Sequence, residues 1–254
     1  MARAGRGERR IVLLAHYDSA KTFFLYHPRR VRGFRRTFLI HAVLATSLPL
    51  LVVWIPILAR AAGVFFLMQA ALLLHRERTA PYVNGANDNA TGVAVAVQLF
   101  LEEAPRLPPG VELWVVLTGA EEVGARGARA LLADLPPPAQ TLVLNIDNVG
   151  QGQLYYAEAE GMLRLYRYAG PLVPAARGLE GAAPLRYRLA YFDTLPLTRA
   201  GYPCLTLIRL EGGVPPHWHW PTDTPDNVDV RAVDDTLAYA RALLRSVLSP
   251  PSSP

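Results

Sequence analysis

The sequence is short of residues that cross-link a fold or bind metal through sulfur. Cys204 is its single cysteine, which excludes an internal disulfide and any zinc cluster held by several thiolates. Lysine is equally scarce, because one lysine and 25 arginines carry the net charge of +5. No basic helix with interleaved aromatic residues occurs, so nucleic acid is not expected as a partner. A secretory leader is not expected either, because "MARAGRGERR" runs directly into a strand-like segment.

Apolar runs alternate with helical patterns along most of the chain. Residues 10–15, 111–118, 141–147 and 204–210 resemble buried strands, and residues 90–103, 124–135 and 230–248 have helical periodicity. This alternation predicts an α/β fold: a mainly parallel, doubly wound sheet flanked by helices, with its site at the carboxyl ends of the strands. The predicted organisation is one catalytic domain over residues 1–36 and 77–249, with a disordered tail at 250–254.

Residues 38–74 interrupt this pattern with an apolar run. A single membrane crossing needs about 20 apolar residues, so this run predicts an inserted apolar helical hairpin over residues 37–76, with its turn near "IPILARAAG". Contact with the lipid bilayer through 38–74 is the favoured interpretation, and a buried core hairpin or a dimerisation arm is the alternative. The oligomeric state is not predicted.

Arginines gather beside this run. Nine arginines precede residue 37, and Arg76 and Arg78 follow the run. Basic flanks favour an anionic membrane surface and lie mostly on the cytoplasmic side. Because both flanks join the same predicted domain, the run crosses twice or enters and leaves on one side. The expected location is therefore the cell membrane, with the catalytic domain facing the cytoplasm.

Metal-competent side chains follow the ends of the predicted strands. They are His16, Asp18, Asp88, Glu121, Glu122, Asp147 and His219. Two histidines with several carboxylates and no thiolate form a nitrogen and oxygen ligand set that suits a catalytic zinc ion or a similar divalent ion. The sequence therefore predicts a metal centre at the carboxyl edge of the sheet.

The motifs around these residues resemble those of the M28 family of zinc aminopeptidases. "HYDS", "GANDNATG", "TGAEEVG", "NIDNVG" and "WHWPTDTPDNVD" occur in that family's order, and the resemblance covers roughly residues 10–250. It implies a zinc-dependent metallopeptidase that hydrolyses amino-terminal peptide bonds of a peptide substrate through a metal-activated water. It also implies two zinc ions per chain, with one zinc ion as the alternative.

The resemblance assigns a role to each of these residues. It implies that His16 and Asp147 bind one zinc, that Glu122 and His219 bind the other, and that Asp88 bridges both. Glu121 matches the general base, and Asp18 matches the residue that steadies His16. These roles agree with the chemistry: a neighbouring carboxylate can take the proton of the water, and Asp18 can accept the second N–H of the imidazole.

Three features depart from the family pattern. Trp218 precedes His219 where several of these aminopeptidases carry an oxyanion-stabilising tyrosine, and "WH" with "HYDS" also resembles the one-zinc glutaminyl cyclases. The segment usually read as "SDH" or "DDH" is "FDT", in which Asp193 matches the aspartate and Thr194 replaces the histidine. The family also has a helix and antiparallel strands before the first motif. Ten residues look too few for them, so either the sheet lacks that edge or the native protein begins upstream of Met1.

Two alternatives therefore stand beside the aminopeptidase. One is a glutaminyl-peptide cyclotransferase-like enzyme with one zinc, and the other is a non-catalytic binding protein on a peptidase fold. Trp218, Asp193 and Tyr191 are the expected substrate contacts. Tyr187 and Tyr191 are the candidates for stabilising the oxyanion.

Overall fold

The structure, a computed structural model, describes residues 1–52 and 56–248. Eight strands form one mixed sheet in the order β1-β3-β2-β4-β8-β5-β6, with β7 paired to β5. The strands are β1 (Ala2–Gly5), β2 (Arg9–His16), β3 (Val111–Thr118), β4 (Thr141–Ile146), β5 (Gln153–Glu160), β6 (Tyr166–Arg167), β7 (Ala183–Tyr187) and β8 (Cys204–Leu210). The predicted α/β class is confirmed, and the four predicted strands are β2, β3, β4 and β8.

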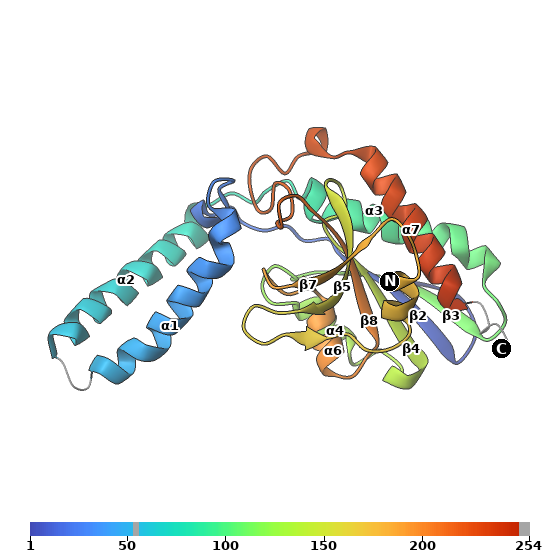
Figure 1. Cartoon of the computed structure of the whole chain (residues 1–254), viewed down its shortest axis with the longest axis horizontal. Helices are drawn as coiled ribbons and strands as arrows, with labels where there is room; N and C mark the ends of the chain where they lie inside the picture. Colours follow the sequence, from blue (N-terminus) through green and yellow to red (C-terminus); the bar gives the residue numbers. More distant parts are fainter. Residues whose placement is uncertain (53–55, 249–254) are drawn as a thin grey trace.

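Helices cover both faces of this sheet (Figure 1). They are α3 (Thr91–Glu103), α4 (Arg126–Leu131), α5 (Leu172–Arg177), α6 (Thr194–Arg199) and α7 (Val230–Leu248). Contacts join α3 and α5 to α7, and α4 to α6. Along β2 the side chains alternate between two apolar clusters: Ile11 and Leu13 belong to one, and Val12 and Leu14 to the other. A parallel strand buried on both faces is apolar throughout, which is why β2 reads as an uninterrupted apolar run.

The amino-terminal edge of the sheet corrects an expectation. Ten residues looked too few for an antiparallel strand before β2, yet β1 pairs antiparallel with β3, from Ala2 opposite Val115 to Gly5 opposite Glu112. The chain reverses tightly after β1, where Gly5 has a φ of +77° that a side chain would strain. A tight reversal lets four residues supply the edge strand.

The predicted apolar insertion is a pair of long helices that projects away from the sheet (Figure 1). They are α1 (Phe34–Val52) and α2 (Pro56–Thr79). They contact each other through His41, whose Nε2 lies 3.0 Å from Gln69 Nε2 and whose ring stacks near Phe65. Because α1 begins at Phe34, the helical part starts earlier than expected. Arg60, expected near the turn, lies in the first part of α2, four residues after its start at Pro56.

The outer surface of this helix pair is apolar and exposed. More than half of the exposed large apolar side chains of the described residues lie on it: Ile40, Val43, Leu50, Ile57, Val64, Leu67, Met68, Leu72, Leu73 and Leu74. Among the described residues one helix, Ile57–Thr79, is long and apolar enough to cross a membrane, and only 6% of its most apolar window is buried. The alternative of a hairpin buried in the core of this chain is therefore wrong. The predicted disordered tail at 250–254 lies outside the described residues.

Candidate metal centre

The ends of three adjacent strands bring most of the metal-competent side chains together. His16 is the last residue of β2, and β2 lies between β3 and β4. Asp147 directly follows β4, and Glu121 and Glu122 lie in the turn that follows β3. Asp88 comes from the segment Ala86–Ala90 before α3, and His219 from the loop after β8. The parallel strands of the sheet thus place residues distant in sequence at one edge.

Asp88 stands between two groups of potential ligands. His16 Nε2 lies 3.2 Å from Asp88 Oδ1 and 3.6 Å from Asp147 Oδ1. His219 Nε2 lies 3.2 Å from the other oxygen, Asp88 Oδ2, and 2.9 Å from Glu122 Oε2. In each three-residue group the donor atoms lie within 4.8 Å of one another. The two groups share Asp88, whose two oxygens face two different histidines.

The chemistry of this cluster fits bound dications. His16 and Asp88 are each 2% exposed, Asp147 is 4% exposed and His219 is 7% exposed. Glu122 Oε1 is buried and has no hydrogen-bond partner among the described residues. Buried carboxylates so close together are costly unless cations offset their charge. A nitrogen and oxygen donor set with an unpartnered carboxylate oxygen is what a zinc ion would satisfy.

Burial and charge shift the titration of the cluster in opposite directions. Burial lowers the pKa of His16, but hydrogen bonds to Asp147, Asp18 and Asp88 raise it well above its usual value. Burial likewise opposes the charge of His219, whose pKa is nevertheless raised well above its usual value by Glu122 and Asp88. Each imidazole therefore faces enough negative charge to hold a cation, whether a proton or a metal ion.

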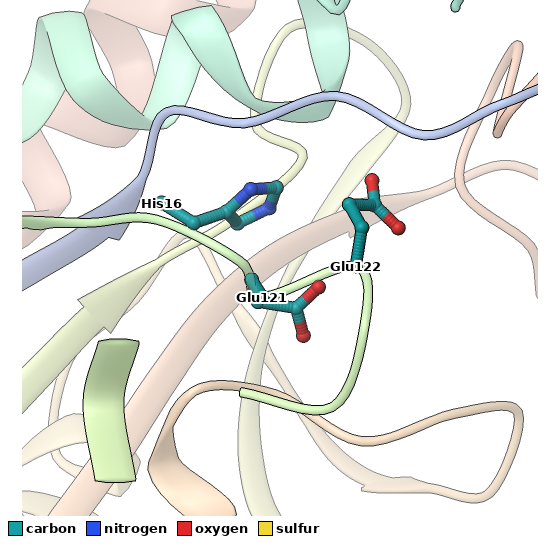
Figure 2. Close-up of side chains that lie close together, drawn as sticks. All are labelled: His16, Glu121 and Glu122. Carbon is teal, nitrogen blue, oxygen red and sulfur yellow. The ribbon is translucent and has the colours of Figure 1, made fainter. Parts of the chain in front are cut away.

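The two adjacent glutamates leave one turn in different directions (Figure 2). Glu122 reaches His219, whereas Glu121 makes no side-chain hydrogen bond or ion pair that the described residues show. Burial raises the pKa of Glu121 well above its usual value, partly against the charge of His16. His16, Glu121 and Glu122 also form a third group whose donor atoms lie within 4.8 Å of one another. The carboxylate of Glu121 is thus placed either to exchange a proton beside the cluster or to bind a metal ion.

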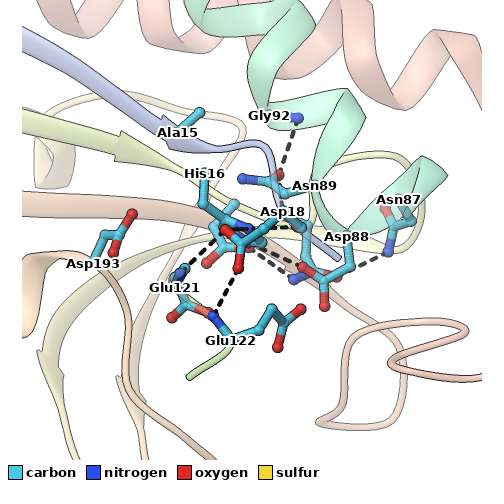
Figure 3. A network of polar contacts seen from close by, with 12 residues as sticks. Ala15, His16, Asp18, Asn87, Asp88, Asn89, Gly92, Glu121, Glu122 and Asp193 are labelled. Carbon is cyan, nitrogen blue, oxygen red and sulfur yellow. Dashed lines mark hydrogen bonds and ion pairs between the residues drawn. The ribbon is translucent and has the colours of Figure 1, made fainter. Parts of the chain in front are cut away.

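Asp18 supports this turn as well as His16. Its backbone carbonyl lies 3.1 Å from His16 Nδ1, while its side-chain Oδ1 lies at 3.6 Å. The carboxylate of Asp18 accepts the backbone N–H of Glu121 at 3.1 Å and that of Glu122 at 3.2 Å (Figure 3). The carbonyl, rather than the expected carboxylate, is therefore the closer acceptor for the imidazole N–H. The carboxylate fixes the turn that carries the two glutamates.

Asp223 holds the backbone of the segment that carries Asp88. The sequence motifs did not predict this role. Its carboxylate, 1% exposed, accepts the backbone N–H of Asn87 at 2.6 Å and that of Asp88 at 3.2 Å. The side-chain amide of Asn87 donates to Asn148 and Pro216 and accepts the N–H of Gly150. The only signal in the sequence was the position of Asp223 within "WHWPTDTPDNVD".

A cavity of about 430 Å³ opens beside the cluster. Two of the three expected substrate contacts, Trp218 and Tyr191, line it, but Asp193 does not. Asp193 is 1% exposed and accepts a hydrogen bond from Thr118, so it lies behind the cavity wall. Tyr187 lines the cavity and stacks on Phe192 with 4.4 Å between ring centroids. Burial and the carboxylates of Asp147, Asp88 and Glu121 raise the pKa of Tyr187 well above its usual value.

Comparisons with solved structures place this fold among zinc exopeptidases. A zinc aminopeptidase from Bacillus subtilis superimposes with a TM-score of 0.62 at 16% identity, over 96% of this chain and 48% of that chain. An aminopeptidase from Aneurinibacillus sp. strain AM-1 gives 0.59 at 18% identity, over 98% and 48%. A glutaminyl cyclase from Tannerella forsythia gives 0.57 at 18% identity, over 96% and 75%.

These identities show a shared fold, and this chain spans about half the length of the two aminopeptidases. No curated protein matches the sequence. The sequence model of peptidase family M28, however, matches residues 1–244, which is nearly the whole chain. The protein belongs to peptidase family M28.

Proposed function

We propose that this protein is a zinc-dependent aminopeptidase. The observation that carries the proposal is the position of Asp88, whose two oxygens lie 3.2 Å from the Nε2 atoms of His16 and His219. Asp147 completes one group of ligands and Glu122 the other. A carboxylate shared between two such groups is the arrangement that holds a pair of metal ions close together.

The other residues of the site would transfer protons and stabilise the oxyanion that forms on the scissile carbonyl. Zinc ions held by the two groups would lower the pKa of a bound water to about 7 and so supply hydroxide at neutral pH. Glu121 would take the proton of that water and return it to the leaving amine. The hydroxyl of Tyr187, which lines the cavity, would donate a hydrogen bond to the developing oxyanion.

A glutaminyl-peptide cyclotransferase is the second candidate. Trp218 directly precedes His219, and the two rings lie 4.8 Å apart at the cavity wall. This pairing resembles the glutaminyl cyclases, one of which shares the fold. Such an enzyme would close an amino-terminal glutamine into a ring and release ammonia without hydrolysing a peptide bond.

One incubation separates these candidates. The purified protein is incubated with a panel of peptides that differ in their first residue, including one that begins with glutamine. The masses of the products are measured by mass spectrometry. The aminopeptidase proposal expects peptides shortened by one residue. A mass loss of ammonia confined to the glutamine peptide would support the cyclase instead. A metal-free protein without turnover on any peptide would support a non-catalytic binding protein.

We also propose that α1 and α2 attach the protein to a lipid bilayer. Their apolar surface is exposed, and basic residues flank them or lie at their ends in the sequence: Lys21, Arg29, Arg30, Arg32, Arg35, Arg36, Arg76 and Arg78. Apolar helices flanked by arginines suit insertion into a bilayer with anionic headgroups. At about 1.5 Å per residue, the 19 residues of α1 and the 24 of α2 reach roughly 28 and 36 Å, comparable with the hydrocarbon thickness of about 30 Å.

Both ends of the insertion are tied together at its base. Thr22 donates its backbone N–H to Pro81 O at 3.1 Å, and Val83 donates to Ala20 O at 2.9 Å. The side chains of Lys21 and Glu77 lie 2.9 Å apart. Because the two ends are joined, a single crossing is incompatible with this geometry. The hairpin would enter and leave on one side, which the arginine flanks assign to the cytoplasm.

Single cysteines test this orientation. Cysteine replaces Ile57 at the start of α2 in one variant and Glu180 on the catalytic part in another, and intact cells receive a membrane-impermeant thiol reagent. Cys204 stays unlabelled because it is fully buried and burial raises its pKa to about 12. Labelling of the cysteine at position 180 from outside would reverse the orientation. Labelling at neither position would favour a re-entrant or peripheral hairpin.

A further inference from the structure

The base of the insertion forms part of the cavity beside the metal centre. Phe34 and Phe38 of α1, together with Tyr26 just before it, line the same cavity as His16, Asp88 and His219. Phe34 and Phe38 are four residues apart, so they share one face of α1. The insertion is therefore a wall of the site as well as an appendage of the domain.

A continuous group of aromatic rings links α1 to a candidate zinc ligand. The ring centroid of Tyr26 lies 4.4 Å from that of His219, 5.0 Å from that of Trp218 and 5.2 Å from that of Phe34. Phe34 lies 5.3 Å from Trp218. We call Tyr26, Phe34, Phe38 and Trp218 the aromatic wall. Phe38 belongs to it because it lines the same cavity, and Tyr26 and Trp218 bring it to the candidate zinc ligand His219.

Phe38, at the outer end of the aromatic wall, would lie where the proposed hairpin meets the membrane. Phe38 begins the apolar run, and Arg35 and Arg36 precede it by less than one helical turn. Arginines at this position would lie among the lipid headgroups, with Phe38 at the boundary of the hydrocarbon. One wall of the cavity is thus continuous with the membrane-facing surface of α1.

We propose that the enzyme takes its substrates from the membrane interface along this wall. The substrates would be peptides whose apolar amino-terminal end lies at the bilayer surface, so that the first side chain slides over Phe38 and Phe34 to the metal centre. An apolar side chain stays in contact with apolar surface throughout this path and is never fully exposed to water. This inference rests on the proposed aminopeptidase activity and membrane attachment.

The test compares two peptides of identical sequence that begin with leucine, one free and one carrying a carboxyl-terminal acyl chain. The full-length protein is incubated with each in anionic phospholipid vesicles, and kcat/KM is measured. The wild type should prefer the acylated peptide. In Phe38→Ser, removal of one aromatic side chain should reduce kcat/KM for the acylated peptide about tenfold. Hydrolysis of the free peptide should fall less, because that peptide enters the cavity from solution. Vesicle binding and zinc content should change little.

Ile40→Ser is the matched control, because Ile40 lies on the same helix, is 48% exposed and does not line the cavity. It should retain the wild-type preference. A Phe38→Ser protein that binds vesicles and keeps the full preference would overturn the proposal, because shared attachment to the vesicle would then explain it. Equal losses on both peptides would also overturn it. A wild type that cleaves neither peptide would instead refute the aminopeptidase activity itself.

Discussion

Asp223→Asn should weaken zinc binding without removing any ligand. The carboxylate of Asp223 accepts two backbone N–H groups, from Asn87 at 2.6 Å and from Asp88 at 3.2 Å. An asparagine side chain has one carbonyl oxygen, so its NH₂ group would face one of these donors. A hydrogen bond to a charged group contributes about 1.5 to 3 kcal/mol, and that amount of the free energy of unfolding should be lost. For a chain of this size the melting temperature should fall by roughly 3 to 12 °C.

The loss should also appear in metal affinity. Asp223 fixes the backbone of Asp88, and outer partners of metal ligands typically change affinity by about 10 to 100-fold when mutated. The assay is a zinc titration of metal-free protein against a chelator, with thermal unfolding of the same samples. Asp226→Asn is the control, since Asp226 is exposed on the same loop and should change stability by no more than about 0.5 kcal/mol. Unchanged zinc affinity and melting temperature in Asp223→Asn would refute this reasoning.

Further predictions concern catalysis and pH. Glu121→Gln should lower kcat by about 10² to 10⁴-fold with zinc content nearly unchanged. Glu122→Gln should instead lose metal, because it removes a ligand. Near wild-type turnover in Glu121→Gln would exclude Glu121 as the general base. Tyr187→Phe should lower kcat more than it changes KM if the hydroxyl stabilises the oxyanion, and identical kinetics would exclude that role. Mild acid should reduce activity because protons compete with zinc for the ligands, and added zinc should partly restore it. Burial raises the pKa of Glu160 from a usual value of 4.5 to about 7, so the folded chain binds this proton more tightly than the unfolded chain. Its stabilising effect is complete below about pH 4.5 and is lost as the pH rises through about 7, in total about 3 kcal/mol. Urea unfolding of Glu160→Gln should lack this slope, and parallel pH curves for the two proteins would contradict it.

The sequence predicted the central strands well because they are buried on both faces. The strand expected at 111–118 has those bounds, and the closing helix runs over Val230–Leu248 as expected. β5 was not predicted because acidic residues interrupt it, as in "YYAEAE". Glu160 is nevertheless buried there, since Tyr168, Thr194 and the N–H of Phe192 donate hydrogen bonds to it. These donors lie far along the chain, so no local pattern could reveal them.

The metal-competent residues were predictable because each one lies in a recognisable motif, at or after the end of a strand or just before a helix. The structure places His16, Asp88, Glu122, Asp147 and His219 in two groups that share Asp88, and a third group joins His16 and Glu122 to Glu121. The aromatic wall was not predictable, because Tyr26 and Phe34 are nearly 200 positions away from Trp218. Their contact depends on how the insertion leaves the sheet, and the apolar pattern of the insertion showed only its helices. Asp193 was expected to contact the substrate but does not line the cavity. A sequence motif does not show which of its side chains faces a cavity.

The number of zinc ions per chain tests the central claim most directly. The full-length protein is loaded with zinc, separated from free metal and measured by elemental analysis, and the hydrolysis rate of a leucine-first peptide is followed as zinc is added to metal-free protein. The account predicts two zinc ions per chain and hydrolysis that is complete only when both are bound, with Asp88→Asn impairing both. One zinc ion per chain with full activity, or hydrolysis in the absence of zinc, would contradict a centre shared through Asp88.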